Sequence, residues 1–179
     1  SLISSRVFCL ADPRTYGSGN PGADDVLSSG NKKAALMTLI GDALKGAVAV
    51  IVAQQMGLSD TLIALVALAV FLGHLYPIFL KFKGGKGVAT AAGVLLALDP
   101  ILGLAVAGTW LLVAYVSRYS SLAALIAAAA APVISALMHG ANNQTIVVGI
   151  LGMALIGKHW QNIQRLMAGQ ESKIGSKKK

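Results

Sequence analysis

Charged residues are scarce in this chain, and their scarcity excludes an ordinary water-soluble domain. Asp, Glu, Lys and Arg make up 12% of the 179 residues, against about 25% in typical soluble proteins. Hydrophobic residues make up 55% of the chain, and the mean hydropathy is +0.70. We therefore expect the chain to lie in a membrane.

Cysteine is nearly absent as well. Cys9 is the only one, which excludes a disulfide framework and argues against a metal site built on thiolates. No charged segment precedes an apolar stretch at the start of the chain, so no cleavable signal peptide is predicted. The chain begins at Ser1, and Leu2–Ala11 resembles the end of an apolar helix. We therefore expect the first helix to lack its first part.

Long hydrophobic runs fill most of the remaining sequence. Crossing a membrane takes about 20 apolar residues in a helix. The segments that meet or approach this length are Ala34–Met56, Leu62–Leu80, Ile101–Val116, Leu122–Met138 and Ile146–Gly157. Val88–Leu98 is shorter and is either a tilted, partly buried span or a re-entrant piece. The sequence thus predicts an all-α integral membrane protein, a multi-span helical bundle forming one domain over residues 1–179.

The positive charges predict how the bundle is oriented. If each apolar segment crosses once, residues 12–33, 81–87, 117–121 and the tail from Lys158 lie on one side. All fifteen Lys and Arg except Arg6 and Lys45 lie in or directly beside these loops, and none lies in the turns on the other side. This asymmetry predicts that the first side is cytoplasmic. The net charge of +8 therefore indicates orientation and anionic lipid rather than a nucleic-acid partner.

The first cytoplasmic loop carries a glycine-rich motif. It reads Gly17-Ser18-Gly19-Asn20-Pro21-Gly22, which matches the dinucleotide-binding pattern G-x-G-x-x-G. No strand precedes the motif and a proline interrupts it, so a Rossmann fold is not indicated. Two interpretations stay open: an ordinary turn, or a turn whose Ser18 and Asn20 bond an oxyanion.

A second motif lies between two apolar segments and reads Phe82-Lys83-Gly84-Gly85-Lys86-Gly87. Bare glycine backbone beside two lysines suits phosphate binding, although lysines at a membrane edge also serve orientation alone. It is not a Walker-type P-loop, because Gly87 stands where Ser or Thr is required. Thr90 follows near the start of the next helix, where amides favour an anion. Upstream, Pro77 should end or kink its helix, and His74 is either a packing residue or a catalytic one.

The third motif begins at His159 and follows the last apolar segment. In a helix His159 and Asn162 share a face, as do Asn162 and Arg165. A histidine here either packs or joins the two glycine-rich loops in one site. Asp42 and Lys45, one turn apart within the membrane, form either a mutual ion pair or a substrate contact.

Taken in order over nearly the whole chain, these motifs resemble those of the bacterial acyl-phosphate:glycerol-3-phosphate acyltransferase family (PlsY-type). The resemblance implies seven transmembrane helices in the bacterial inner membrane, with the active site facing the cytoplasm. It implies transfer of an acyl group from acyl phosphate to the 1-hydroxyl of glycerol 3-phosphate, giving lysophosphatidate and phosphate for phospholipid biosynthesis. It implies no CoA, acyl carrier protein, metal or other cofactor. It also implies a functional link to the soluble enzyme that makes acyl phosphate.

The resemblance also assigns site residues. Those expected to act in catalysis are His159, Asn162, Lys86 and Ser18. Those expected to bind substrate are Gly17, Gly19, Asn20, Gly84, Gly85, Gly87, Lys83, Ser121, Arg165 and Glu171. His159 would orient or deprotonate the acceptor hydroxyl, although in this family the substrate phosphate is also discussed as the proton acceptor.

The chain departs from the family pattern just after the first motif. Where the family usually has Thr, Asn and Arg, this chain has Asp24, Asp25 and Ser28. A carboxylate about 4 Å from a phosphate costs on the order of 4 kcal/mol per charge pair near a protein surface. We expect these substitutions to impair activity.

A transporter or binder of an organic phosphate is the alternative class. Transporters of this kind place their site near the midplane, at broken helices and often between inverted repeats. The sequence shows no repeat, and its motifs gather at one face, which favours the acyltransferase.

Overall fold

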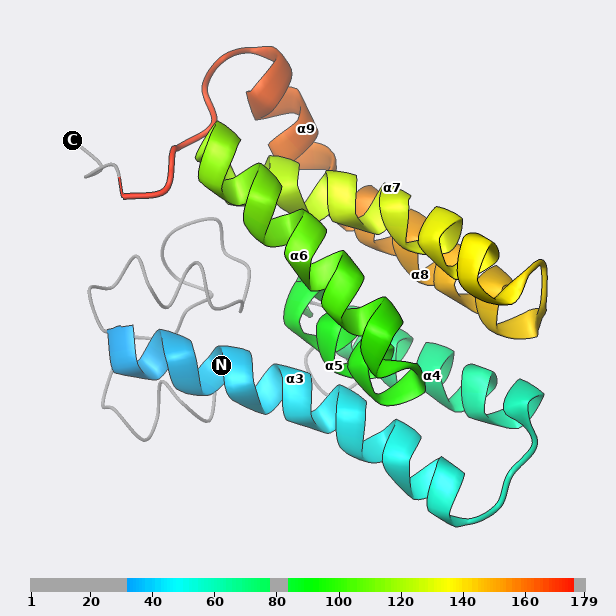
Figure 1. Ribbon diagram of the computed structural model, residues 1–179. Coiled ribbons are helices and arrows are strands. Elements are labelled where there is room, and N and C mark those ends of the chain that lie inside the picture. Colours follow the sequence, from blue (N-terminus) through cyan, green and yellow to red (C-terminus); the bar gives the residue numbers. More distant parts are fainter. Residues whose placement is uncertain (1–31, 78–83, 176–179) are drawn as a thin grey trace.

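The computed structural model describes residues 32–77 and 84–175, and all regular structure in these ranges is α-helical. The helices are α3 (Lys32–Gln55), α4 (Asp60–Leu75), α5 (Val88–Leu98), α6 (Pro100–Ser117), α7 (Ser120–His139), α8 (Asn143–Lys158) and α9 (Trp160–Met167). The predicted all-helical fold is confirmed (Figure 1). Each apolar segment predicted within the described ranges corresponds to one of the helices α3 to α8, and Ala34–Met56 extends one residue past the end of α3.

Three of these helices, α3, α6 and α7, have the length and hydropathy to cross a membrane, while α4, α5 and α8 are apolar but shorter. The predicted segment Leu62–Leu80 is too long, because α4 ends at Leu75. Proline disfavours helix at the residue before it, and Pro77 follows closely. Residues 78–80 of that segment, like Leu2–Ala11, lie outside the described residues.

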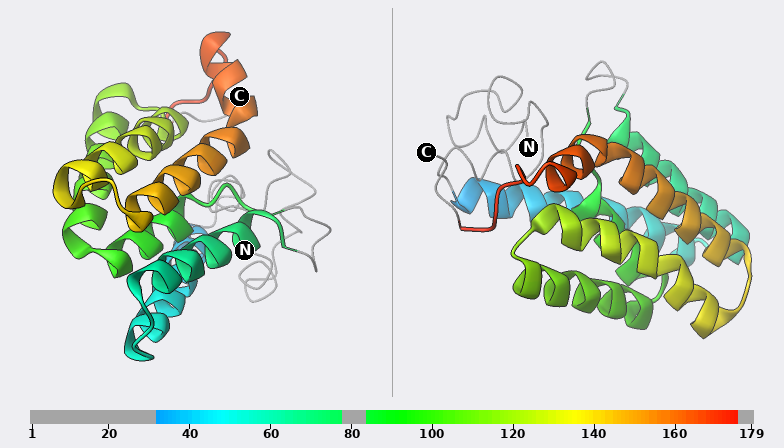
Figure 2. Two further views of the ribbon diagram at one scale, coloured as in Figure 1. Left: turned by 90° about the vertical axis from the view of Figure 1, so that its right-hand side faces the viewer. Right: turned by 90° about the horizontal axis from the view of Figure 1, so that it is seen from above.

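The helices alternate in direction along the bundle. Helices α3, α5 and α7 begin at the end where α4, α6 and α8 finish and where α9 lies; we call this the motif end (Figures 1 and 2). The turns between α3 and α4, α5 and α6, and α7 and α8 lie at the opposite end. All the described predicted site residues therefore come to one end of the bundle.

Small residues allow α3 and α5 to pack closely. A Cβ added to Gly46 would lie 2.6 Å from the Thr90 carbonyl oxygen, and one added to Gly93 would lie 2.7 Å from the Ala43 carbonyl carbon. Glycine at such points lets two helix backbones approach, which is typical of helix pairs in membranes. This contact fixes the start of α5, where the second motif ends, against α3.

Apolar side chains cover the outer faces of the bundle. On α6, Leu111, Tyr115 and Val116 are between 62% and 86% exposed. Such exposure of large apolar groups suits contact with lipid rather than water. The interior contains Phe71, Leu75, Val50 and Val94, each fully buried.

Asp99 starts α6 at the opposite end of the bundle. The backbone N–H groups of Ile101 and Leu102 donate to its Oδ1 at 2.7 and 3.2 Å. Pro100 occupies the first helical position, where its missing N–H costs nothing. The Asp-Pro pair thus ends α5 and begins α6 within two residues, and this makes α5 a short, separate helix.

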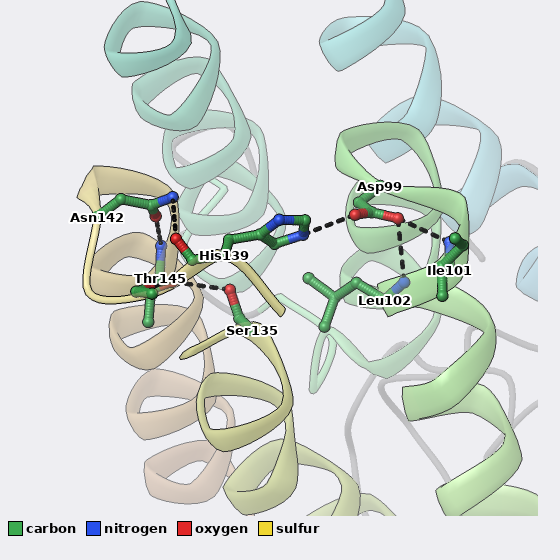
Figure 3. Close-up of polar contacts among 8 residues, drawn as sticks. Asp99, Ile101, Leu102, Ser135, His139, Asn142 and Thr145 are labelled. Carbon is green, nitrogen blue, oxygen red and sulfur yellow. Dashed lines mark hydrogen bonds and ion pairs between the residues drawn. The ribbon is translucent and has the colours of Figure 1, made fainter. Parts of the chain in front are cut away.

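A polar cluster joins the turns at this end (Figure 3). His139, the last residue of α7, places Nε2 2.7 Å from Oδ2 of Asp99. Asn142 accepts a hydrogen bond from the Thr145 amide at 2.8 Å and so caps α8, and the hydroxyls of Thr145 and Ser135 lie 2.9 Å apart. The cluster ties α6, α7 and α8 together at the end remote from the motifs.

Candidate functional site

The loop Gly84–Gly87 is pressed against the end of α4. A Cβ on Gly84 would lie 2.6 Å from both the Leu75 carbonyl oxygen and Cδ of Pro77. Gly87 has a φ of 86°, and a Cβ there would lie 2.6 Å from Cε2 of Phe71. At Gly84 the lack of space excludes a side chain, and at Gly87 both the lack of space and the left-handed backbone conformation exclude one. The glycines of the second motif are therefore required by the fold as well as suited to a ligand.

Helix α5 points its N-terminus at this loop. Gly87 is its N-cap, and the amide of Ala91 donates to the Gly87 carbonyl at 2.8 Å. The amides of residues 88–90 precede that bond and lie in the first turn, where the helix dipole attracts anions. Lys86 stands half-buried in the loop, and the buried Oγ1 of Thr90 has no hydrogen-bond partner within the described residues. The cation and the amides together form a local environment suited to phosphate.

Four of the predicted site residues meet at the other side of the motif end. The Glu171 carboxylate accepts hydrogen bonds from Oγ of Ser121 at 2.6 Å, Nδ2 of Asn162 at 2.6 Å and Nε of Arg165 at 2.7 Å. Ser121 lies at the start of α7, and the other two donors lie on α9. We call these four residues the Glu171 cluster; they fasten the segment after α9 to both helices.

The Glu171 cluster also determines the charge state of its acceptor. Burial of the carboxylate opposes ionisation, but the hydrogen bonds from Ser121, Asn162 and Arg165 outweigh it and lower the pKa of Glu171 below its ordinary value of 4.5. Glu171 is therefore an anion at neutral pH, and its negative charge balances the Arg165 guanidinium.

His159 lies at the break between α8 and α9 and is only 2% exposed. Its Nδ1 lies 2.9 Å from the carbonyl oxygen of Leu155. A carbonyl can only accept, so Nδ1 carries the ring proton and Nε2 keeps the lone pair. This tautomer suits a general base acting through Nε2.

Asn162 is 5% exposed and places its two polar atoms in different surroundings. Its amide nitrogen is fixed by Glu171, whereas its buried Oδ1 has no hydrogen-bond partner in the described part of the chain. A buried acceptor of this kind is suited to a ligand that carries a hydroxyl. His159 and Asn162 share a face of the chain as the i, i+3 spacing predicts.

Asp42, Lys45 and His74 form a second polar group, between α3 and α4. Lys45 Nζ lies 2.7 Å from Oδ1 of Asp42 and also contacts Nδ1 of His74. Of the two interpretations left open for Asp42 and Lys45, the structure shows the ion pair, and it adds the histidine as a third member.

Some of the predicted site residues lie outside the described part of the chain, and their roles stay predictions. These are Gly17, Ser18, Gly19, Asn20 and Lys83. The three departures from the family pattern, at positions 24, 25 and 28, lie outside it as well. Gly84, Gly85, Lys86 and Gly87 lie in their loop at the motif end, as do His159 and the Glu171 cluster. The structure shows this shared location, and the role of each residue remains a proposal.

One contact at the motif end was not anticipated. Lys158 lies 3.9 Å from the centre of the Tyr76 ring, a cation–π contact between the ends of α8 and α4. The sequence had assigned Lys158 only to membrane orientation, and nothing in the spacing of residues 76 and 158 predicted the pair. Within the described residues no group of three or more His, Cys, Asp or Glu side chains could hold a metal ion.

The fold and the site define an integral membrane protein of apolar helices with a polar, phosphate-suited site at one end. A family model described as glycerol-3-phosphate acyltransferase matches residues 1–169. A glycerol-3-phosphate acyltransferase of Dechloromonas aromatica (strain RCB) is 83% identical over 179 residues, covering 100% of this chain and 90% of that protein. One of Burkholderia multivorans (strain ATCC 17616 / 249) is 59% identical over 181 residues, covering 100% and 85%. The chain belongs to the glycerol-3-phosphate acyltransferase family.

Solved structures agree with this assignment. The crystal structure of PlsY (YgiH), an integral membrane glycerol 3-phosphate acyltransferase in its glycerol 3-phosphate form, matches with a TM-score of 0.89 and 34% identity. The match covers 97% of this chain and 88% of that one. The lysophosphatidic acid form of the same enzyme matches with a TM-score of 0.87. The membrane fold and the family predicted from the sequence are confirmed.

Proposed function

We propose that this chain is a glycerol-3-phosphate 1-O-acyltransferase that uses acyl phosphate as donor. The observation that carries the proposal is the placement, at one end of a membrane bundle, of a phosphate-suited loop and a buried His–Asn pair. The family's substrates have matching chemistry: both carry phosphate, and one carries the hydroxyl that is acylated. The whole chain, residues 1–179, acts as one domain in this proposal.

The reaction needs little from the protein beyond positioning and one proton transfer. Acyl phosphate is a mixed anhydride with a good leaving group, so no covalent intermediate with the protein is required. The acceptor hydroxyl oxygen bonds to the acyl carbon, the carbon–oxygen bond to phosphate breaks, and phosphate leaves. We assign the hydroxyl proton to Nε2 of His159, and we assign to Asn162 Oδ1 a hydrogen bond that orients the glycerol moiety.

The phosphate groups are bound by cations and amides in this scheme. Lys86, the amides around Gly84–Gly87 and the first turn of α5 bind one phosphate. Ser18, Asn20 and Lys83 are proposed to complete the site from the first two motifs. Ser121 and Arg165 both donate to Glu171, so their contribution to substrate binding requires part of that cluster to rearrange.

We propose that this site faces the cytoplasm at the bacterial inner membrane, an orientation supported by the Lys and Arg residues that gather in the loops at the motif end. Glycerol 3-phosphate then arrives from the cytoplasm, and the acyl chain and the lysophosphatidate product remain in lipid. The acyl phosphate must be supplied by an enzyme that makes it, which is the functional partner we propose.

A phosphate-release assay tests the proposed function. Purified protein receives palmitoyl phosphate and glycerol 3-phosphate, with each substrate omitted in turn. Release that requires both substrates, with lysophosphatidate formed in equal amount, is the expected result. Uptake of labelled glycerol 3-phosphate into vesicles without product would refute the acyltransferase and favour the transporter.

The departure in the first motif gives a separate prediction. Restoring Asp24→Thr, Asp25→Asn and Ser28→Arg removes two carboxylates and adds a cation near the proposed phosphate site. We expect the triple variant to raise kcat/KM in the same assay. An unchanged value would show that the present residues are tolerated.

A further inference from the structure

His74 lies directly behind the glycine loop, in a partly buried polar group with Asp42 and Lys45. Its side chain is 8% exposed and that of Asp42 is 16% exposed, whereas that of Lys45 is 41% exposed. Lys45 contacts both residues, donating to Asp42 Oδ1 and to Nδ1 of the imidazole. Three ionisable groups at membrane depth are costly unless they serve a purpose beyond packing.

The contact with Lys45 determines which ring nitrogen of His74 carries the proton. An ammonium group has three donors and no acceptor, so Nδ1 of His74 must accept. The proton of the neutral ring therefore resides on Nε2. Asp42, 3.7 Å from Nδ1, balances the charge of Lys45 and keeps that ammonium beside the ring.

The Nε2 edge of this ring faces the glycine loop. A Cβ added to Gly85 would come closest to Nε2 of His74 and would lie 2.9 Å from its Cε1. Gly85 is buried, and the preceding Gly84 lies against the backbone of the last turn of α4. The absence of a side chain at Gly85 thus leaves the imidazole N–H next to the loop backbone.

We propose that His74 is a further substrate-binding residue, whose Nε2–H donates to the phosphate held by the Gly84–Gly87 loop. The Lys45–Asp42 pair is a positioning group that fixes the donor tautomer. This proposal rests on the proposed function, because it takes the loop to bind a phosphate-bearing substrate. It adds a neutral donor from α4 to the cation of Lys86 and the amides of α5, so three elements surround one phosphate.

Three substitutions separate hydrogen bonding from packing. In His74→Gln the amide nitrogen lies near the place of Nε2, so the donor is kept. In His74→Asn the shorter side chain places its amide near Nδ1, and in His74→Leu the bulk remains without a donor. The readouts are kcat and KM for each substrate, and the Kd of glycerol 3-phosphate from ligand-induced shifts in Tm, which need no turnover.

We expect His74→Leu and His74→Asn to raise KM, or Kd, for one phosphate substrate about ten- to hundredfold, the range for a hydrogen bond to a charged group. His74→Gln should stay within about threefold of wild type, and kcat should change less than KM in all three. Equal losses in the Gln and Leu variants would show that only packing matters and would overturn the proposal. Wild-type behaviour of the Asn and Leu variants would overturn it as well.

Lys86→Ala separates this proposal from the proposed function. If Lys86→Ala weakens phosphate binding while all His74 variants bind normally, the inference about His74 is wrong and the acyltransferase function stands. If wild-type protein neither turns over nor binds glycerol 3-phosphate, both are wrong.

The contact that a Cβ at Gly85 would make with the His74 ring provides a second test. Gly85→Ala should weaken phosphate binding because its methyl group displaces the His74 ring. Adding His74→Ala to Gly85→Ala should then cost little more, so the two effects should be far from additive. Additive effects would show that the ring and the loop act independently, against the proposal.

Discussion

Replacing Glu171 perturbs the one acceptor on which three site residues converge. Glu171→Ala leaves the Ser121 and Asn162 donors without a partner, and these residues are 8% and 5% exposed. A buried donor left unsatisfied costs about 1–3 kcal/mol. The Arg165 side chain is 37% exposed and can turn to water, so its ion pair adds less than about 1 kcal/mol.

The expected loss from Glu171→Ala is therefore about 2–6 kcal/mol in the free energy that holds α9 and the following segment against α7. Glu171→Gln is the matched control. Its amide oxygen still accepts from Ser121 and Asn162, and only the charge and the acceptor for Arg165 are lost. We expect Gln to cost less than about 1 kcal/mol, which is about 2–6 kcal/mol less than Ala.

Hydrogen exchange of backbone amides in detergent micelles measures this local opening. A loss of about 2–6 kcal/mol corresponds to about 30-fold to 20,000-fold faster exchange across α9 and residues 168–175. Exchange in α6, which does not touch Glu171 through any of these bonds, is the internal control. Unchanged protection of α9 in Glu171→Ala would refute the reasoning, and equal effects of Ala and Gln would show that the hydrogen-bonded oxygen is not what matters.

The pH dependence of amide exchange in α9 is an independent test of the role of Glu171. The folded pKa of Glu171 lies below its ordinary value of 4.5, because its hydrogen bonds outweigh burial. A depressed folded pKa means that the stabilisation is complete above pH 4.5 and is lost as the pH falls through the folded value. Protection of α9 in wild type should hold down to about pH 4.5 and weaken only below it, after correction for intrinsic exchange rates, whereas Glu171→Gln should show no such step.

Three further predictions concern other parts of the molecule. In the phosphate-release assay, His159→Ala should lower kcat by about a hundredfold or more, which is the range for the loss of a general base. Near-normal turnover would show that the substrate phosphate takes the proton. Lys86→Ala should raise KM for a phosphate substrate, and an unchanged KM would count against its role. At the opposite end, Asp99→Ala should lower stability by about 1–2 kcal/mol through the lost N-cap. Asp99→Asn keeps the cap and changes only the carboxylate oxygen that contacts Nε2 of His139, so its Tm should lie between those of wild type and Asp99→Ala.

The helices and the family were readable from the sequence because they rest on local properties. Length and hydropathy gave the helices, and the Asp99-Pro100 pair marked the end of α5. The boundary that hydropathy set for α4 at Leu80 was wrong, because hydropathy does not register the backbone constraint of a proline. The separate prediction that Pro77 ends or kinks the helix agrees with the end of α4 at Leu75. Motif spacing gave the family, which the comparisons confirm.

The site was only partly readable from the same information. The i, i+3 spacing predicted that His159 and Asn162 share a face, since helix geometry fixes that. The convergence of Ser121, Asn162 and Arg165 on Glu171 depends on how α7 meets α9 and the segment that follows. Residues 50 apart in the chain meet at Ser121 and Glu171, and no local rule specifies such a pair.

The sequence by itself therefore determined that this is a membrane bundle of the acyltransferase family, with its polar motifs at one end. These features follow from the transfer of apolar segments out of water and from the short turns that reverse the direction of the chain. Both depend on the local sequence. Tertiary structure alone decided that Lys45 bonds to His74 and that the imidazole stands behind Gly85. It decided also that Glu171 serves as a shared acceptor. Side chains from separate helices acquire their tautomers and charge states only where packing brings a specific donor to a specific acceptor.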